Sequence, residues 1–274
     1  MASSAALRHG VLAATVALAI SSCGPQESSP PLAAGETAPA AAETSGSATA
    51  TPAAPGDRLP DLVMLPVRSF YVAYEGDKRV LRFGTDVANR GEGPLDLTGV
   101  RDSPREADLQ VTQNILQTGG GWRSAETDAV MRFEAVDGHD HFHVQDFERY
   151  RLRPEEGTEW RGSHKEGFCL RDDGNLGGTT SRYDDDDFYC GADEEQELTE
   201  LRMGLSEGWV DVYDWYYPGQ YIDLEGLELP GNFCVEAEAD PDGLLVEKTR
   251  ENNTTSALVR ITETEVSLVR EECQ

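Results

Sequence analysis

The chain has 274 residues, with 51 Asp and Glu against 23 Lys and Arg, so its formal net charge is −28 at pH 7. A chain of this length can form one substantial domain or two small ones. Its negative field repels phosphate backbones, which excludes duplex nucleic acid as a default partner. The same field concentrates amines, cationic peptides or divalent metals.

Residues 1–22 are typical of an export signal, with one early basic residue, Arg8, and an apolar stretch too short to span a bilayer comfortably. The small residues that lead into Cys23 in "AISSC" resemble the lipobox of bacterial lipoproteins, in which that cysteine is lipidated and becomes the new N-terminus. An ordinary cleavable signal with an incidental cysteine is the alternative. Both kinds of signal place the mature chain outside the cytoplasm, and the lipoprotein signal would also anchor it to the cell envelope through Cys23.

Residues 23–56 form the next segment, which is rich in Pro, Ala, Ser and Thr and nearly free of large apolar residues. Such a composition cannot bury enough surface to offset the entropy of ordering the chain. We therefore expect a disordered tether, which after a lipid anchor would hold the folded part away from the membrane.

Residues 57–274 predict one mainly β, antiparallel domain of the sandwich type with long loops. Short runs of near-alternating apolar and polar residues are separated by Gly, Pro, Asn and Asp, and they cover residues 59–76, 78–91, 93–100, 147–154, 232–241 and 256–269. No repeat of βαβ units is evident. The expected helices are few and short, around residues 107–117 and 194–205.

Four cysteines remain once Cys23 is set aside, and an even number in an oxidising compartment favours two disulfides. They allow three pairings. Pairing neighbours in sequence closes the shorter loops, so we prefer Cys169 with Cys190 and Cys234 with Cys273.

Three of the chain's five histidines, His139, His141 and His143, lie at alternate positions in "GHDHFHVQDFERY". On a strand these positions project from one face, so the three imidazoles would converge. Three neutral imidazoles can bind a metal and leave positions open for water, oxygen or substrate. Zinc, copper, iron and nickel all accept such ligands, and a histidine strip without metal is the alternative.

A cupin metal site is a second interpretation of the same residues, because His141, His143 and Glu148 fit an H-x-H motif followed by a carboxylate. A cupin usually supplies another histidine from a later strand. The last histidine of this chain is His164, so that ligand is lacking.

Ordered sequence blocks resemble the catalytic domain of the lysyl oxidase family. They are "GHDHFHVQDFERYRL", "HKEGFCLRDD", "GWVDVYDWYYPGQYIDL" and "PGNFCVEAEADPDGLLVEKTRENN", preceded by "LPDLV" and "VLRFGTDVANRG". The likeness spans residues 57–262, which is nearly the whole expected domain. Ordered blocks of this kind are far more specific than any one motif.

The resemblance implies copper and a protein-derived quinone, lysine tyrosylquinone, formed by joining a lysine to an oxidised tyrosine. The copper ligands would be His139, His141 and His143. The lysine falls on Lys165, four residues before a cysteine, and the tyrosine on Tyr213, seven residues before a glutamine. Without the resemblance, Lys165 would be a solvated surface lysine and Tyr213 a core aromatic residue.

A shift of register would move the tyrosine assignment to Tyr216 or Tyr217. The implied reaction is oxidative deamination of a primary amine, either peptidyl lysine or a small amine, to an aldehyde, with oxygen consumed and hydrogen peroxide and ammonia released. An extracytoplasmic copper-binding β-sandwich without the quinone, and an adhesive acidic domain without metal, are the alternative functions.

The chain departs from the family at two positions near the ligands. Gly138 replaces a cysteine that precedes the first ligand in vertebrate members, which makes a Cys169–Cys190 pair more plausible. Arg149 replaces a histidine suggested there as the catalytic base. Asp211 and Asp214 are then the candidates for the base.

The segment "EKTRENN" also resembles a calcium-binding segment of the family. Its ligands would be Glu247, Asn252 and Asn253, with Asp61 and the Leu62 carbonyl from the distant "PDLV", and Thr249 replaces an acidic ligand. Ligands that are all oxygen suit calcium. Asparagines that only turn a β connection are the alternative.

Overall fold

The structure is a computed structural model that describes residues 52–135, 140–165, 167–184, 190–191 and 197–273. These residues belong to one compact unit, Gly46–Gln274. The expected signal at 1–22, Cys23 and most of the expected tether lie outside the described residues, and so does His139. Among the residues described, no helix is both long enough and apolar enough to span a membrane.

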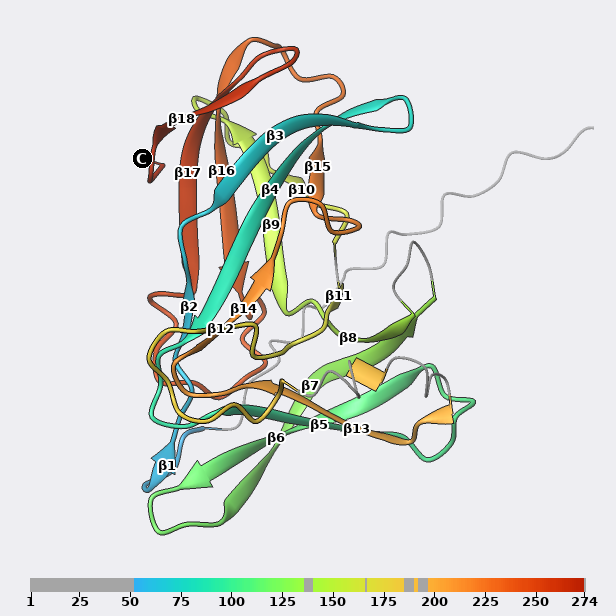
Figure 1. Cartoon of the computed structure of the whole chain (residues 1–274), viewed down its shortest axis with the longest axis vertical. Helices are drawn as coiled ribbons and strands as arrows, with labels where there is room; N and C mark the ends of the chain where they lie inside the picture. Colours follow the sequence, from blue (N-terminus) through green and yellow to red (C-terminus); the bar gives the residue numbers. More distant parts are fainter. Residues whose placement is uncertain (1–51, 136–139, 166, 185–189, 192–196, 274) are drawn as a thin grey trace, which may run out of the picture. The chain divides into compact units, whose positions relative to one another are not determined.

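The fold consists of antiparallel β-sheets, which confirms the mainly β prediction (Figure 1). The first sheet has seven strands, ordered β11 (Gly167–Phe168), β8 (His141–Gln145), β7 (Trp122–Glu134), β6 (Asp108–Gln117), β5 (Leu95–Val100) and β13 (Glu200–Leu205), with β1 (Asp57–Arg58) beside β6.

Two further sheets complete the described part of the domain. The five-stranded sheet is ordered β10 (Arg161–Gly162), β9 (Glu148–Pro154), β16 (Gly231–Ala239), β17 (Thr254–Ile261) and β18 (Val266–Arg270). The six-stranded sheet is ordered β12 (Gly174–Asn175), β14 (Trp209–Tyr213), β4 (Lys78–Asn89) and β15 (Tyr221–Asp223), with β2 (Leu62–Met64) and β3 (Arg68–Glu75) beside β4.

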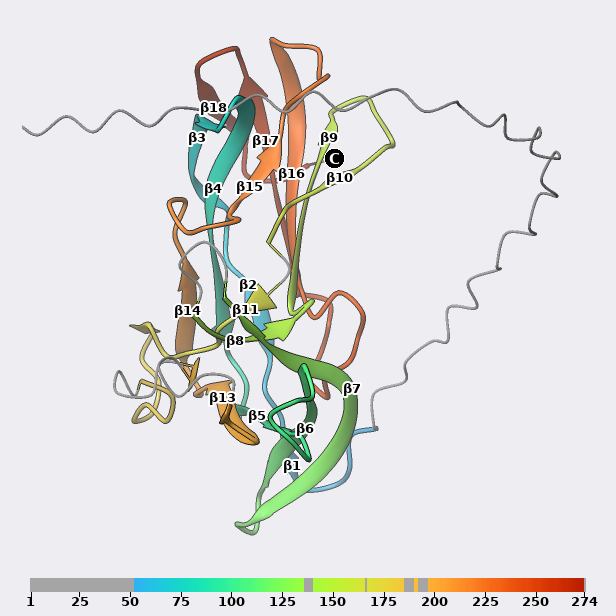
Figure 2. The ribbon, with the colours of Figure 1, turned by 90° about the vertical axis from the view of Figure 1, so that its right-hand side faces the viewer.

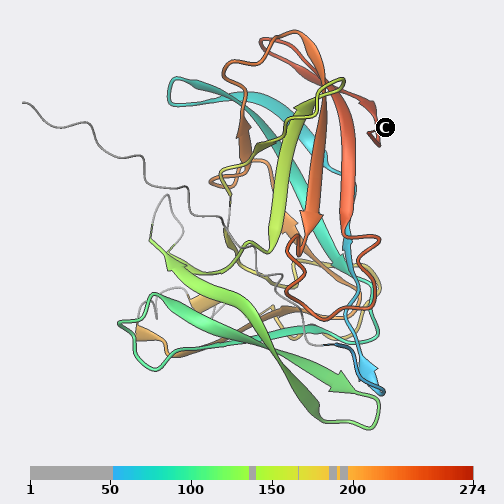
Figure 3. The ribbon, with the colours of Figure 1, turned by 180° about the vertical axis from the view of Figure 1, so that it is seen from behind.

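The five-stranded and six-stranded sheets pack against each other. β16 and β17 contact β2, β18 contacts β3, and β9 contacts β15. Figure 2 shows β3 and β4 on one side of this pair and β9 and β16 on the other, and Figure 3 shows the five-stranded sheet from behind.

One continuous hydrophobic core holds the three sheets together. Its fully buried members include Leu97 and Met131 from the first sheet, Val235 from the second and Phe83 from the third. Burial of such side chains is the main force that stabilises the packed sheets.

The predicted helix at 107–117 is wrong, because these residues form β6. Leu109, Val111, Gln113 and Ile115 are buried at alternate positions. This period of two is that of a strand, and β6 also bonds to β5 and β7 on its two sides. In the second predicted helix, residues 200–205 form β13, paired with β5, and residues 194–196 lie outside the described part.

Both preferred disulfides are confirmed. Cys169 bonds to Cys190 with a Cα–Cα distance of 5.9 Å, and Cys234 bonds to Cys273 at 5.8 Å. The second bond ties the C-terminal end to β16, while the first holds the segment that follows β11.

Truncation of Leu97 tests the contribution of the core. We expect Leu97→Ala to lower the free energy of unfolding by about 2–5 kcal/mol, because it leaves a cavity among fully buried side chains. Urea unfolding measures the change. Leu176→Ala is the matched control, since Leu176 is 52% exposed, and equal losses in the two variants would contradict the prediction.

Candidate functional site

The candidate site lies where the three sheets meet, at the buried ring of Phe168. Phe168 is on β11, and its ring centroid lies 5.8 Å from that of Tyr150 on β9 and 5.1 Å from that of Tyr213 on β14. Strand β11 also pairs with β8, with Phe168 opposite Val144. One short strand thus brings the segments of the histidines, the lysine and the tyrosine together.

His141 and His143 lie on β8 as the alternating pattern predicts. Their ring centroids are 4.5 Å apart, and both side chains are buried. Phe142 between them points to the opposite face and packs against Phe133 in the core. The third predicted ligand, His139, lies outside the described residues, so the structure does not test the trio.

Glu134 on β7 holds His143 in one orientation. Nδ1 of His143 lies 2.9 Å from Oε2 of Glu134, and Gln145 donates from Nε2 to Oε1 of Glu134 at 3.1 Å. If Nδ1 carries the hydrogen, Nε2 has the free lone pair and is the atom that can bind a metal. Burial lowers the pKa of His143, which favours the neutral imidazole that metals require.

This arrangement fits a transition metal, because a metal-binding histidine usually donates a hydrogen bond from its second ring N–H to a group such as a carboxylate. Within the described ranges, no group of three or more His, Cys, Asp or Glu side chains is placed to hold a metal. The two described histidines need a third ligand, and His139 remains the predicted one. Glu134 has no signal in the linear sequence, because only the pairing of β7 with β8 brings it to His143.

Lys165 is buried, contrary to the expectation for a surface lysine. It is 7% exposed, and its Nζ lies 5.0 Å from the ring centroids of both Phe168 and Tyr213. Burial lowers the pKa of Lys165 to about 8, while the charges of Glu134, Glu148 and Asp211 act in the opposite direction. About a tenth of such amines are uncharged at pH 7.

Tyr213 is buried and firmly oriented. Its hydroxyl donates to the carbonyl oxygen of Cys169 at 2.9 Å, and Cys169 is itself held by its disulfide. Tyr216 is 56% exposed, and the ring of the partly buried Tyr217 lies 6.2 Å from that of Tyr213. The ring of Tyr213 is the one for which a contact with Lys165 is described, at 5.0 Å from Nζ to the ring centroid.

The two aspartates suggested as bases have different surroundings. Asp211 is 1% exposed, and burial raises its pKa well above the ordinary value, with further raising by Asp173 and Glu148. Asp214 forms an ion pair with Arg68 at 2.8 Å. Neither assignment as a base is tested by these contacts.

The two halves of the predicted calcium site are close together. The Leu62 amide donates to Glu247 at 3.2 Å, Asn252 donates to Asp61 at 3.0 Å, and Asn253 donates to Glu247 at 2.7 Å. The Oδ1 atoms of Asn252 and Asn253 are buried and have no hydrogen-bond partner among the described residues.

Buried oxygens of this kind fit a hard cation such as calcium. Neighbouring groups also bond to the residues of this segment. Arg250 lies 3.7 Å from Glu247 and is paired with Asp240 at 2.5 Å, and the Thr249 hydroxyl accepts a bond from the Glu251 amide at 3.2 Å. The structure brings the predicted calcium ligands together, and their binding of calcium stays a prediction.

The fold and the site together define a class of protein: a mainly β domain in which a histidine pair lies near a buried lysine and a buried tyrosine. The chain belongs to the lysyl oxidase family, because residues 106–273 match the family model described as lysyl oxidase. The match includes both histidines, Lys165, Tyr213 and Glu247, and it begins after Asp61 and Leu62.

The chain is also similar to lysyl oxidase homolog 3B of Danio rerio, with 30% identity over 116 residues. That stretch covers 42% of this chain and 13% of the relative. Membership of the family excludes the cupin interpretation of His141, His143 and Glu148.

Glu134→Gln tests the orienting role of the carboxylate. We expect copper(II) affinity to fall about 10–100-fold, because a neutral amide holds the His143 Nδ1 hydrogen less strongly. Competition with a chelator of known affinity measures the change. Asp128→Asn on the exposed side of β7 is the control, and undiminished affinity in Glu134→Gln would contradict the assignment.

Calcium addition tests the second site. Burial raises the pKa of Glu247 from 4.5 to about 7, so ionisation in the folded protein lowers stability as pH rises across that window, and a bound cation should reverse the loss. At one hundred times the dissociation constant we expect the melting temperature to rise by about 5–10 °C at pH 8, and less at pH 5. Glu247→Gln should remove most of this rise, and equal shifts in both proteins would refute the site.

Proposed function

We propose that this protein is a copper-dependent amine oxidase of the lysyl oxidase type, which converts primary amines to aldehydes. Family membership supports the reaction class. The observation that carries the proposal for this chain is the buried contact between Lys165 and Tyr213, with Nζ 5.0 Å from the ring centroid. In balanced form, a protonated amine, oxygen and water give an aldehyde, hydrogen peroxide and ammonium.

The copper would be held by His139, His141 and His143, and the lysine tyrosylquinone would be made from Lys165 and Tyr213. Bound copper would support the oxidation of the tyrosine by oxygen, and the quinone would supply an electrophilic carbonyl able to accept two electrons. In the join of the two side chains, one ring hydrogen of Tyr213 would be replaced by oxygen and another by Nζ of Lys165. Molecular oxygen is the oxidant, and water and hydrogen peroxide leave.

The protein's own residues prepare this join. Burial lowers the pKa of Lys165 to about 8, which provides the uncharged amine that a bond-forming nitrogen needs. The hydrogen bond from Tyr213 to the Cys169 carbonyl fixes the ring beside Nζ. Phe168 excludes water from one side of both groups, since its ring is fully buried.

We further propose that substrate amines reach the protein outside the cytoplasm, with the domain held at the cell envelope by a lipid on Cys23. Two disulfides support an oxidising compartment. The net charge of −28 would raise the local concentration of cationic amines, including lysine side chains of proteins and small amines.

Lys165→Ala provides the principal test. We expect hydrogen peroxide release from primary amines to be abolished, because the quinone cannot form, while copper content stays nearly unchanged. Peroxide assay, metal analysis and peptide mapping for a joined Lys165–Tyr213 pair give the three readouts. Lys248→Ala, at an exposed lysine, is the matched control.

Retained turnover in Lys165→Ala would refute the quinone assignment. Copper binding with two unmodified peptides in the wild-type protein would favour the alternative, a copper-binding β-sandwich without oxidase activity. The visible spectrum of the copper-loaded protein, with and without phenylhydrazine, reports the quinone directly.

A further inference from the structure

Glu148 is a buried carboxyl group for which the proposed function gives no role. It lies at the start of β9 and is 2% exposed. Its Oε2 accepts a hydrogen bond from the Tyr150 hydroxyl at 2.7 Å, while Oε1 is buried and has no hydrogen-bond partner among the described residues. A buried oxygen without a partner is costly, so it requires a physical explanation.

A chain of donors holds Glu148 in place. Gln220 donates from Nε2 to the Thr85 hydroxyl at 3.2 Å, Thr85 bonds to the Tyr150 hydroxyl at 2.7 Å, and Tyr150 donates to Glu148. All the hydrogens of this chain can point toward Oε2. The chain therefore occupies Oε2 and leaves Oε1 as the atom able to take a proton.

The neighbouring cations on β9 point away from Glu148. Arg149 pairs with Glu238 at 2.6 Å, and Arg151 pairs with Glu236. A guanidinium has hydrogen-bond donors and no acceptor, so Arg149 cannot replace the histidine suggested as a base in the family. The charges of Lys165 and Asp86 act on Glu148, and Glu148 in turn raises the pKa of the buried Asp211.

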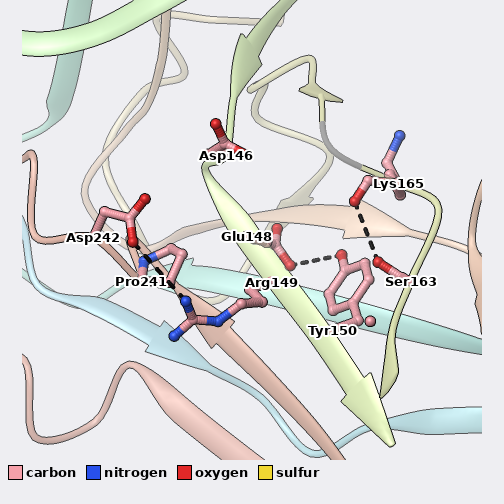
Figure 4. A pocket seen from close by; sticks show the side chains of 9 residues that line it. Asp146, Glu148, Arg149, Tyr150, Ser163, Lys165, Pro241 and Asp242 are labelled. Carbon is pink, nitrogen blue, oxygen red and sulfur yellow. Dashed lines mark hydrogen bonds and ion pairs between the residues drawn. The ribbon is translucent and has the colours of Figure 1, made fainter. Parts of the chain in front are cut away.

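Glu148 and Lys165 line the same pocket, which has a volume of about 190 Å³ (Figure 4). Asp146, Arg149, Ser163 and Asp242 also line it, and Asp211 does not belong to the described lining residues. Because a water molecule takes about 30 Å³, the pocket has room for the end of an alkylamine. Substrate held there would lie beside Glu148, whose Oε1 is buried just behind the lining, and beside the residue proposed to carry the quinone.

Acid–base properties agree with this geometry. Burial raises the pKa of Glu148 to about 8 and lowers that of Lys165 to about 8. A base whose pKa is near the working pH can both take up and release a proton during each turnover.

We propose that Glu148 is the base that removes a proton from the substrate carbon next to the amine nitrogen, with Oε1 as the acceptor atom. This inference rests on the proposed function. The step breaks the C–H bond and forms an O–H bond on Oε1, and the electron pair of the C–H bond passes to the oxidised cofactor. Glu148 then returns the proton to solvent through the pocket, and oxygen takes up the electrons.

Glu148→Gln tests the base. The amide has the same size and still accepts the Tyr150 hydrogen bond, but it cannot take the proton. We expect kcat to fall on the order of 10²–10⁴-fold, and the isotope effect with an amine deuterated at that carbon to become larger. The joined Lys165–Tyr213 peptide and the copper content should be unchanged, which a general loss of structure would not allow.

Two further variants complete this experiment. Glu236→Gln, which removes a carboxylate on the neighbouring strand β16, should leave kcat unchanged. Glu148→Asp should restore part of the rate that Gln removes, and it serves in place of Gln if that variant does not fold, with a kcat at least tenfold below wild type expected. A Glu148→Gln enzyme with kcat within threefold of wild type would overturn the inference.

A measurement on the metal-free protein keeps the two proposals separable. The pH dependence of Lys165 labelling by an amine-reactive reagent should show a lower inflection in Glu148→Gln, because the anion that stabilises the ammonium is gone. An unchanged inflection would overturn the role of Glu148. Absence of amine oxidation in the wild-type protein would instead remove the proposed function, whereas oxidation that does not depend on Glu148 would remove only this inference.

Discussion

The packing of Phe168 is the contact on which the arrangement of the site depends. This ring belongs to a two-residue strand, yet it contacts Tyr150 from the five-stranded sheet and Tyr213 from the six-stranded sheet. Strand β11 is anchored to β8 by its register and is followed at once by the disulfide-bonded Cys169. Lys165 lies three residues before Phe168 and is consequently held over two aromatic rings and not in solvent.

The interior of the site concentrates groups that usually lie at the surface. Lys165, Glu148, Asp211 and His143 are all buried, and burial is the largest cause of each of their pKa shifts. In every case burial favours the uncharged form. Uncharged lysine and imidazole groups are the forms that can make a bond to carbon or to a metal, so the cost of burying these groups coincides with the chemistry proposed for them.

The alternating histidines are a feature that the local sequence pattern predicted correctly. Their period of two placed His141 and His143 on one face of a strand, and the structure has them there. Residues 107–117 were expected to form a short helix, although the side chains buried in β6 follow the same period of two. Hydrogen bonds to strands on both sides decided that segment, and those partners lie elsewhere in the chain.

The sequence by itself determined the mainly β class and the family, and it favoured the pairing of the four cysteines that the structure has. Alternating apolar residues, short loops between cysteines and ordered blocks are all readable along the chain. Only the tertiary structure decided that Glu134 orients His143 and that Glu148 shares a pocket with Lys165. It also decided that the ring of Tyr213 is buried beside Lys165, whereas Tyr216 is exposed. Those relations join residues on different strands, and sheet register and burial, which set them, arise only when the whole domain packs.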